Sequence, residues 1–184
     1  MDANHNWVED VDQIGQTFVH YFEELFTTSK PKVEQEMLDA IQPKVTARMN
    51  SILTREFQAM EVEKALKQMH PLTAPGPDGM PPLFYHHFWP TVKSIVIHTA
   101  LDFLNHGVSP PKFHDTHIVL IPKTKNPEKV TDYRPISLCN VAYKLASKVV
   151  ANRMKPVLQE IIGENQSAFV ADASSLTMSW WLTK

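Results

Sequence analysis

The stretch TAPGPDGM, residues 73–80, is the feature that most restricts how this chain can fold. It contains two prolines and two of the five glycines of the 184-residue chain. Proline lacks the amide hydrogen of regular structure and glycine permits left-handed backbone, so neither a helix nor a strand is expected to run through it. We therefore predict a loop with a permissive backbone at Gly76 and Gly79. Asp78 is predicted to be a turn or cap residue.

Apolar side chains recur with helical spacing before this loop. Between residues 10 and 28 the spacing predicts an amphipathic helix that faces a core. A second helix is expected to end before Pro71, because proline disfavours the helical conformation of the residue that precedes it. The predicted buried positions are Val11, Ile14, Phe18, Phe22 and Leu25 in the first helix and Val62, Ala65, Leu66 and Met69 in the second.

A short helix and a long one are expected directly after the loop. Pro90 suits the first turn of the long helix, and Gly107 suits the position just past its end. A further helix is predicted from Val141 to about Ile162, with Pro156 expected to kink or break it. The predicted buried positions are Val92, Ile95, Val96, Thr99 and Phe103 in the long helix and Val141, Leu145 and Val149 in the last one.

Two short segments between these helices have the composition of β-strands. THIVLIP and YRPISL are rich in β-branched and aliphatic residues, and the polar segment KTKNPEKVTD separates them. The simplest arrangement is an antiparallel hairpin with a basic tip. The predicted fold class is therefore α+β, with several helices around one small antiparallel β-hairpin.

The charges of the chain are unevenly distributed. The net charge is −2, but residues 123–155 contain eight Lys or Arg against two acidic side chains. This excess makes that segment the candidate for a phosphate-bearing partner, with a solvated helix face as the alternative. A single cysteine and the lack of a long apolar run indicate an intracellular protein that does not span a membrane.

Three quoted segments, in this order, point to a known family. The segments are APGPDGMPPLFYHHFW, HIVLIPKTKNPEKVTDYRPISLCNVAYKLASKVVANRMKPVL and IIGENQSAFV. Together they resemble the reverse transcriptase of plant LINE-type non-LTR retrotransposons. The resemblance covers about residues 50–170. It implies an acidic helical upstream linker region in residues 1–50 and a partial reverse transcriptase domain, the fingers, in residues 51–170.

The resemblance also implies roles for particular side chains. In that family the fingers hairpin folds over the incoming nucleotide. The resemblance places Lys123 and Arg134 where cationic side chains would bind its triphosphate. An RNA template and a DNA primer are the partners of the intact parent, and weak nucleic-acid binding is expected of this chain. Arg153 would support the template-binding side from a neighbouring helix face. The implied template-binding residues are Pro75, Gly76, Pro77, Gly79, Lys144, Lys148 and Lys155.

No catalytic residue or metal ligand is assigned in this chain. Polymerases of this family use two metal ions about 3.5–4 Å apart, held by carboxylates of the palm. The expected aspartate motifs are absent, and FVADA at residues 169–173 offers only one carboxylate. Palm and thumb are therefore expected to be absent, Mg²⁺ is expected only in the intact parent polymerase, and we predict that this chain alone is inactive.

The last residues suggest why those motifs are absent. After QSAFV the family continues approximately as PGRLITDNVLVAYE, whereas this chain continues as ADASSLTMSWWLTK. Codons for DNVLVAYE, read one nucleotide late, give TMSWWLT, which is the sequence of residues 177–183. We therefore expect a frameshift near Ala171 and a tail at residues 171–184 that is not native to the family.

Three other interpretations remain open. The chain could be a noncatalytic nucleic-acid-binding module, or a decayed retroelement product with no present role. A third interpretation is a metal hydrolase built on His114 and His117, although alternation along a strand would send these side chains to opposite faces.

Overall fold

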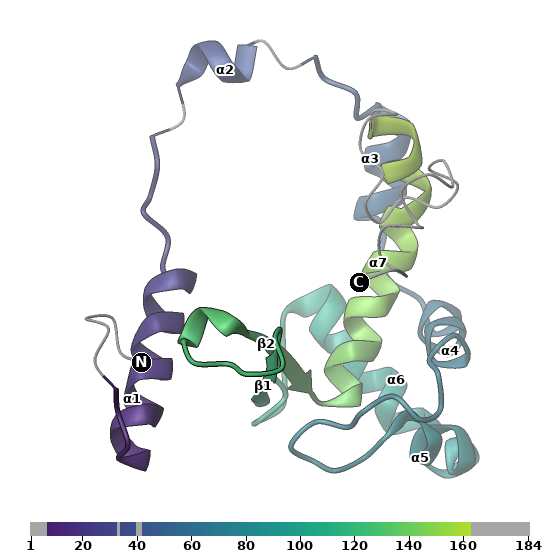
Figure 1. The fold of residues 1–184 in the computed structure, drawn as a ribbon. Coiled ribbons are helices and arrows are strands. Elements are labelled where there is room, and N and C mark those ends of the chain that lie inside the picture. The colour runs from purple at the N-terminus through teal and green to yellow at the C-terminus, as the bar shows by residue number, and fades with distance from the viewer. Residues whose placement is uncertain (1–6, 33, 40–41, 163–184) are drawn as a thin grey trace. The chain divides into compact units, whose positions relative to one another are not determined.

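The computed structural model describes residues 7–32, 34–39 and 42–162. These residues form two compact units, each described by itself (Figure 1). We call residues 1–42 and 117–138 the hairpin unit and residues 43–116 and 139–184 the helical unit, as far as each is described. The hairpin unit holds α1 (Val11–Phe26), α2 (Gln35–Asp39), η1 (Val130–Asp132) and nearly all of β1 (Thr116–Pro122) and β2 (Tyr133–Cys139). The helical unit holds α3 (Ala47–Thr54), α4 (Ala59–Lys67), α5 (Pro82–His87), α6 (Trp89–His106) and α7 (Val141–Ile161).

Three helices, α4, α6 and α7, build the core of the helical unit. They pack pairwise against one another, and α3 and α5 add to the edges. All four apolar positions predicted for the second helix are buried. The spacing of the apolar residues therefore gave the correct inward side of α4. The buried core consists of Val62, Ala65, Leu66, Met69, Tyr85, Ala100, Val141, Leu145 and Val149.

The long helix α6 has the predicted ends, and Val92 and Val96 of its predicted buried stripe pack against the core, whereas Ile95 does not. Pro90 lies in its first turn, and Gly107 follows its last residue with a φ of 70°. Ile95 was predicted to be buried, but 68% of it is exposed. Ala100 is buried instead, on a stripe that continues the half-buried Val96 one turn earlier. Because Ile95 lies about 100° around the helix from Val96, it points away from the core.

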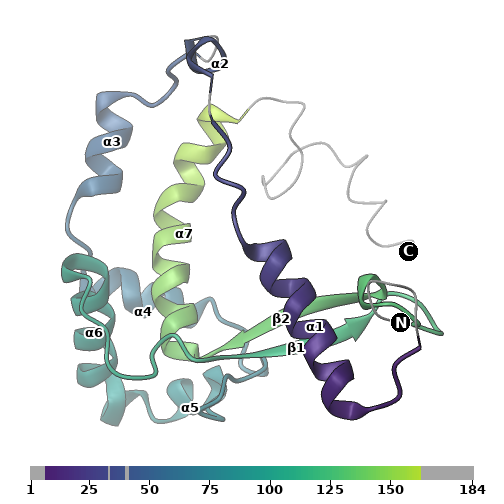
Figure 2. The ribbon, with the colours of Figure 1, turned by 90° about the vertical axis from the view of Figure 1, so that its left-hand side faces the viewer.

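The last described helix, α7, presents its predicted side to the core. Val141, Leu145 and Val149 are all buried, as the sequence indicated. The helix continues to Ile161 (Figure 2), with Pro156 inside it, so the alternative of a break at Pro156 is wrong and a kink there stays a prediction.

The hairpin unit is built on two strands in antiparallel pairing. β1 and β2 form a two-stranded sheet, as predicted, and η1 lies in the loop between them. Helix α1 lies against the loop end of this hairpin (Figure 2), where the rings of Phe18 and Tyr133 meet edge to face at 5.2 Å. The chain is thus helix-rich with one small antiparallel sheet, which confirms the α+β class.

Helix α1 forms where the sequence predicted it, but its apolar side is not buried. Asp10 caps its first turn by accepting the N–H of Gln13 at 2.9 Å. No described residue of α1 is buried, and only some of its apolar side chains, such as Phe18, are half-buried. The prediction that this helix faces a core is therefore wrong within the described structure. A single two-stranded sheet offers too little surface to cover such a helix.

Candidate nucleic-acid interface

The loop of residues 73–80, here called the glycine loop, is a turn closed by its own hydrogen bonds. The N–H of Gly79 donates to the carbonyl of Gly76 at 3.0 Å, and Gly79 has a φ of 70°. One carboxylate oxygen of Asp78 accepts the N–H of Met80 at 3.0 Å. Asp78 is therefore a turn residue, as predicted, and its carboxylate is engaged in shaping the loop.

Helix α5 follows the glycine loop and places Tyr85 in the core. Burial raises the pKa of the Tyr85 phenol to about 12, and the nearby charge of Asp78 contributes to the increase. The phenol therefore stays protonated at neutral pH and acts as a packing group.

Gly76 is required by a close approach of the chain to itself. A Cβ atom added at Gly76 would lie 2.4 Å from the backbone nitrogen of Asn140 and 2.5 Å from its side-chain Oδ1. The same Oδ1 accepts the N–H of Asp78 at 3.1 Å, and Nδ2 of Asn140 donates to the carbonyl of Lys112 at 3.2 Å. Asn140 thus ties the glycine loop to the loop that follows α6.

Asn140 was not among the site residues predicted from the sequence. Its position between a strand and a helix is typical of a helix N-cap, which is the signal that singles it out. Its side chain makes no cap hydrogen bond to α7 and instead contacts the two loops. Contacts over 62 and 28 positions of sequence cannot be read from local spacing.

The predicted lysine stripe lies along α7, and its first member reaches the glycine loop. The ammonium of Lys144 donates to the carbonyl of Ala74 at 2.7 Å. Lys148 is half-buried and Lys155 is exposed. Within the described part of the chain neither of these two has an ion-pair partner. The structure therefore brings Lys144 together with the predicted template loop, while the other two lysines continue along the same helix.

The loop between the two strands is fixed by backbone contacts that involve Lys123. Its N–H donates to the carbonyl of Asp132 at 2.7 Å, and its ammonium donates to the carbonyl of Thr131 at 2.8 Å. The carboxylate of Asp132 accepts the N–H groups of Lys129 and Glu128 at 2.9 and 3.0 Å. These two bonds lower the pKa of Asp132, and the charges of Lys129 and Lys123 lower it further.

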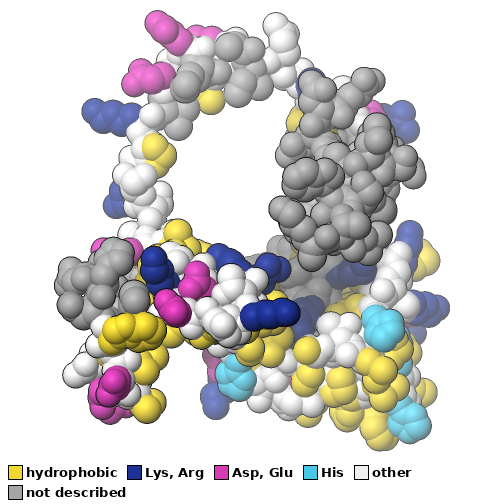
Figure 3. Space-filling model, in the orientation of Figure 1, with side chains coloured by type: hydrophobic (Ala, Val, Ile, Leu, Met, Phe, Trp, Pro, Cys, Tyr) yellow, Lys and Arg dark blue, Asp and Glu magenta, His cyan; other side chains and the backbone are white. Residues whose placement is uncertain are grey.

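Cationic side chains on the hairpin unit are open to solvent. Lys123, Lys125, Lys129 and Arg134 are all exposed. Figure 3 shows dark-blue Lys and Arg side chains over this part of the chain, interspersed with acidic ones. Arg134 has no ion-pair partner among the residues that the structure describes. The assignment of Lys123 and Arg134 to a nucleotide stays a prediction.

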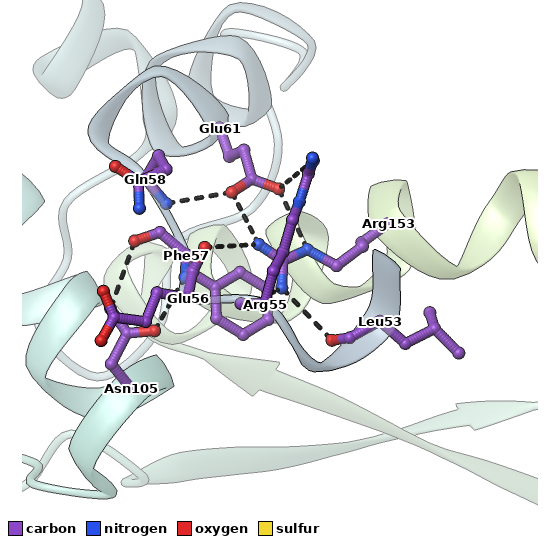
Figure 4. A network of polar contacts seen from close by, with 8 residues as sticks. All are labelled: Leu53, Arg55, Glu56, Phe57, Gln58, Glu61, Asn105 and Arg153. Atoms are coloured by element: carbon purple, nitrogen blue, oxygen red, sulfur yellow. Dashed lines mark hydrogen bonds and ion pairs between the residues drawn. The ribbon is translucent and has the colours of Figure 1, made fainter. Parts of the chain in front are cut away.

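Arg153 is buried and contacts Glu61 and the segment before α4. Only 6% of Arg153 is exposed, and its guanidinium donates to both carboxylate oxygens of Glu61 at 2.7 and 3.1 Å (Figure 4). The ring of Phe57 lies 3.6 Å from the guanidinium carbon. Arg153 is therefore not placed to contact a strand itself, and its support of a template-binding side stays a prediction. The guanidinium also donates to the backbone carbonyls of Leu53, Arg55 and Glu56.

The electrostatics of Glu61 follow from this contact. Burial acts to raise the pKa of Glu61, but the hydrogen bonds from Arg153 and the Gln58 backbone and the charges of Arg153 and Arg55 outweigh it. The pKa of Glu61 is therefore lowered, and the carboxylate is ionised at neutral pH. The ion pair fastens α7 to the start of α4, and the hydrogen bonds of Arg153 to backbone carbonyls fasten α7 to the segment before α4.

The sequence did contain a signal for the buried position of Arg153. It stands four residues after Val149 and four before Val157, and both of these valines are buried. Side chains four apart lie on one helix face, so Arg153 belongs to the inward stripe of α7. Its partner could not be identified from spacing, because Glu61 is 92 positions away.

The described residues contain neither a cluster of metal-ligating side chains nor a helix suited to cross a membrane. Among them no group of three or more His, Cys, Asp or Glu side chains is placed to hold a metal ion. The ring of His114 packs instead among Phe103, Phe113 and Tyr143, with centroid distances of 5.3–5.5 Å. No helix within the described ranges combines the length and the apolar character needed to cross a bilayer.

Comparison with known proteins finds similarity to two transposable elements, and no protein-family model matches the chain. This chain is 27% identical over 162 residues to an uncharacterized 149 kDa protein of transposon TX1 from Xenopus laevis. The matched segment covers 87% of this chain and 12% of that protein. The chain is 30% identical over 98 residues to a retrovirus-related Pol polyprotein from the type-1 retrotransposable element R2 of Nasonia vitripennis, over 53% of this chain and 9% of that protein. The chain thus spans about a tenth of the length of these relatives.

Proposed function

We propose that this chain is part of the reverse transcriptase of a LINE-type non-LTR retrotransposon and supplies nucleic-acid-binding elements of its fingers. The observation that supports this most is the similarity to a transposon protein across 87% of the chain. The second relative is a Pol polyprotein, and it too comes from a retrotransposable element. The α+β arrangement with one exposed cationic hairpin is consistent with such a role.

In this proposal the two units contribute different contacts. Lys123 and Arg134 of the hairpin unit bind the triphosphate of a nucleotide, since a guanidinium offers paired donors and an ammonium a compact charge. In the helical unit the template strand lies along the glycine loop and the lysines of α7. Asn140 fixes the loop on its inner side, where Gly76 contacts the chain itself. The other predicted residues of the loop, Pro75, Pro77 and Gly79, contact the template strand.

The chemistry of polymerisation lies outside this chain in the proposal. In the intact parent polymerase, carboxylates elsewhere hold Mg²⁺, which stabilises the transferring phosphoryl group. This chain positions template and nucleotide and has no catalytic residue of its own. Purified chain with primer, template, nucleotides and Mg²⁺ should therefore give no extension product. Templated synthesis in this assay would show that the assignment of a noncatalytic part is wrong.

Nucleic-acid binding itself is tested by a salt series with single-stranded RNA. Each phosphate contact on a single strand should add about −0.7 to the slope of log affinity against log salt concentration. The double variant Lys148→Ala, Lys155→Ala should lower the magnitude of this slope by about 1.4. A control with Lys32→Ala and Lys67→Ala removes two exposed lysines outside the interface and should leave the slope unchanged. Weak binding without salt dependence would instead favour a decayed product with no present role.

A further inference from the structure

A small cavity in the hairpin unit is lined by aromatic side chains. Its volume is about 190 Å³, and it lies between α1, the residues just before it and the hairpin loop. Trp7, Phe18 and Tyr133 line it, together with Val130 of η1. The rings of Phe18 and Tyr133 are held edge to face with an interplanar angle of 86°. This contact fixes two walls of the cavity, while Trp7 is 66% exposed and leaves its ring available to a ligand.

The size and lining of the cavity suit one planar ring system. Pockets for drug-sized ligands usually start at about 300 Å³, so a cavity of about 190 Å³ accepts a single ring system rather than a whole nucleotide. Aromatic side chains stack on any of the nucleobases, because every base has a flat π-face. A nucleobase therefore matches both the dimensions and the chemistry of this cavity.

The charges around the cavity match the backbone to which a base would be attached. Lys129 lines the cavity itself, and Lys125 is exposed on the same loop. The carboxylate of Asp132 accepts two backbone N–H groups of this loop, so it is engaged inside the turn. Glu128 also lines the cavity. Ammonium groups beside an aromatic pocket are the combination that single-strand binders use for phosphates and bases.

We propose that this cavity takes up one base of a single-stranded nucleic acid whose phosphates contact Lys125 and Lys129. The inference rests on the proposed function and adds to it a base contact made by the segment that precedes the reverse-transcriptase resemblance. Stacking on Trp7 makes the contact independent of base identity.

The test compares two single strands of equal length and charge, one with bases and one abasic, on the full chain at several salt concentrations. Trp7→Ala should weaken binding of the base-bearing strand about tenfold and leave its salt slope and the affinity of the abasic strand unchanged. Trp7→Phe should restore most of the affinity. Phe26→Ala is the matched control, because Phe26 is 68% exposed on α1 and does not line the cavity.

The outcomes separate this inference from the proposed function. Salt-dependent binding of both strands with equal affinity would overturn the base pocket while leaving nucleic-acid binding in place. Absence of binding for both strands would overturn both. A free mononucleotide that binds the wild type but not Trp7→Ala, and that leaves the bound strand in place, would assign the cavity to a soluble nucleotide and would overturn the strand contact. Circular dichroism should show that the variants keep their helical content, since Trp7 lies outside any described helix.

Discussion

Gly76 and Gly79 of the glycine loop restrict substitution for different physical reasons. In Gly76→Ala the new methyl group would lie 2.4 Å from the backbone nitrogen of Asn140, and a backbone atom cannot move aside as a flexible side chain can. We expect a loss of roughly 2–3 kcal/mol in the free energy of unfolding. Gly79→Ala meets no atom within 4 Å but keeps a φ of 70°, which costs about 1 kcal/mol. Urea unfolding of both variants measures the difference, and equal losses would contradict the close contact.

The ion pair between Glu61 and Arg153 predicts a pH dependence of stability. Because the folded state lowers the pKa of Glu61, its contribution is fully present above the unfolded value of 4.5 and is lost as the pH falls through the folded value. Glu61→Gln should cost about 2 kcal/mol at pH 7. The variant should also lose less stability than the wild type between pH 7 and pH 3.

Unfolding in urea at several pH values measures both effects. Glu160→Gln neutralises an exposed carboxylate on α7 and is the matched control. If Glu61→Gln and Glu160→Gln showed the same pH dependence as the wild type, the ion pair would have no part in acid sensitivity.

At the scale of elements, Pro156 removes one backbone hydrogen bond from the interior of α7. It lies inside the helix, so the carbonyl of Asn152 lacks the N–H donor that a regular helix would supply. Pro156→Ala should therefore raise the free energy of unfolding by about 1 kcal/mol or more. Pro90→Ala is the comparison, because Pro90 lies in the first turn of α6, where no such donor is needed. Thermal unfolding should show a higher midpoint for Pro156→Ala only; a lower midpoint would mean that ring packing matters more.

Helices and strands were predictable here because their signals are local. Periodic apolar residues located α1, α4, α6 and α7, and β-branched runs located both strands. The prediction of which side of a helix faces the core failed where that side depends on contacts with other elements. Ile95 has the right period but lies one residue off the stripe that meets the core. The apolar side of α1 has the right pattern but no described surface large enough to cover it.

The candidate site was predictable to a smaller extent. Residue types and spacing identified the glycine loop and the lysines, since turns and charges are visible in a short segment. Asn140 and the contacts of Arg153 were missed because their partners are distant in sequence. An Asn or Arg side chain looks the same in sequence whether it binds a ligand or another part of its own chain.

At the scale of the whole molecule, buried apolar surface is concentrated in one unit. Every residue of the main core cluster belongs to the helical unit, whereas the buried apolar residue described in the hairpin unit is Val130. Amide hydrogens of α4 and α7 should therefore exchange more slowly than those of α1 and β2, because local opening is easiest where few apolar contacts are lost. Hydrogen exchange followed by mass spectrometry compares the peptides directly. Protection of α1 equal to that of α7 would mean that α1 buries its apolar side in solution.

The contact between Asn140 and the glycine loop sets an order of events during synthesis. Asp78 and Asn140 are 62 positions apart, and a ribosome adds about 5–20 residues per second, so the partner of the loop is made roughly 3 to 12 s after the loop itself. Until then the loop has only its local turn, and a chaperone or protease meets it without its final tether. The glycine loop reaches its mature shape only after both strands have been translated.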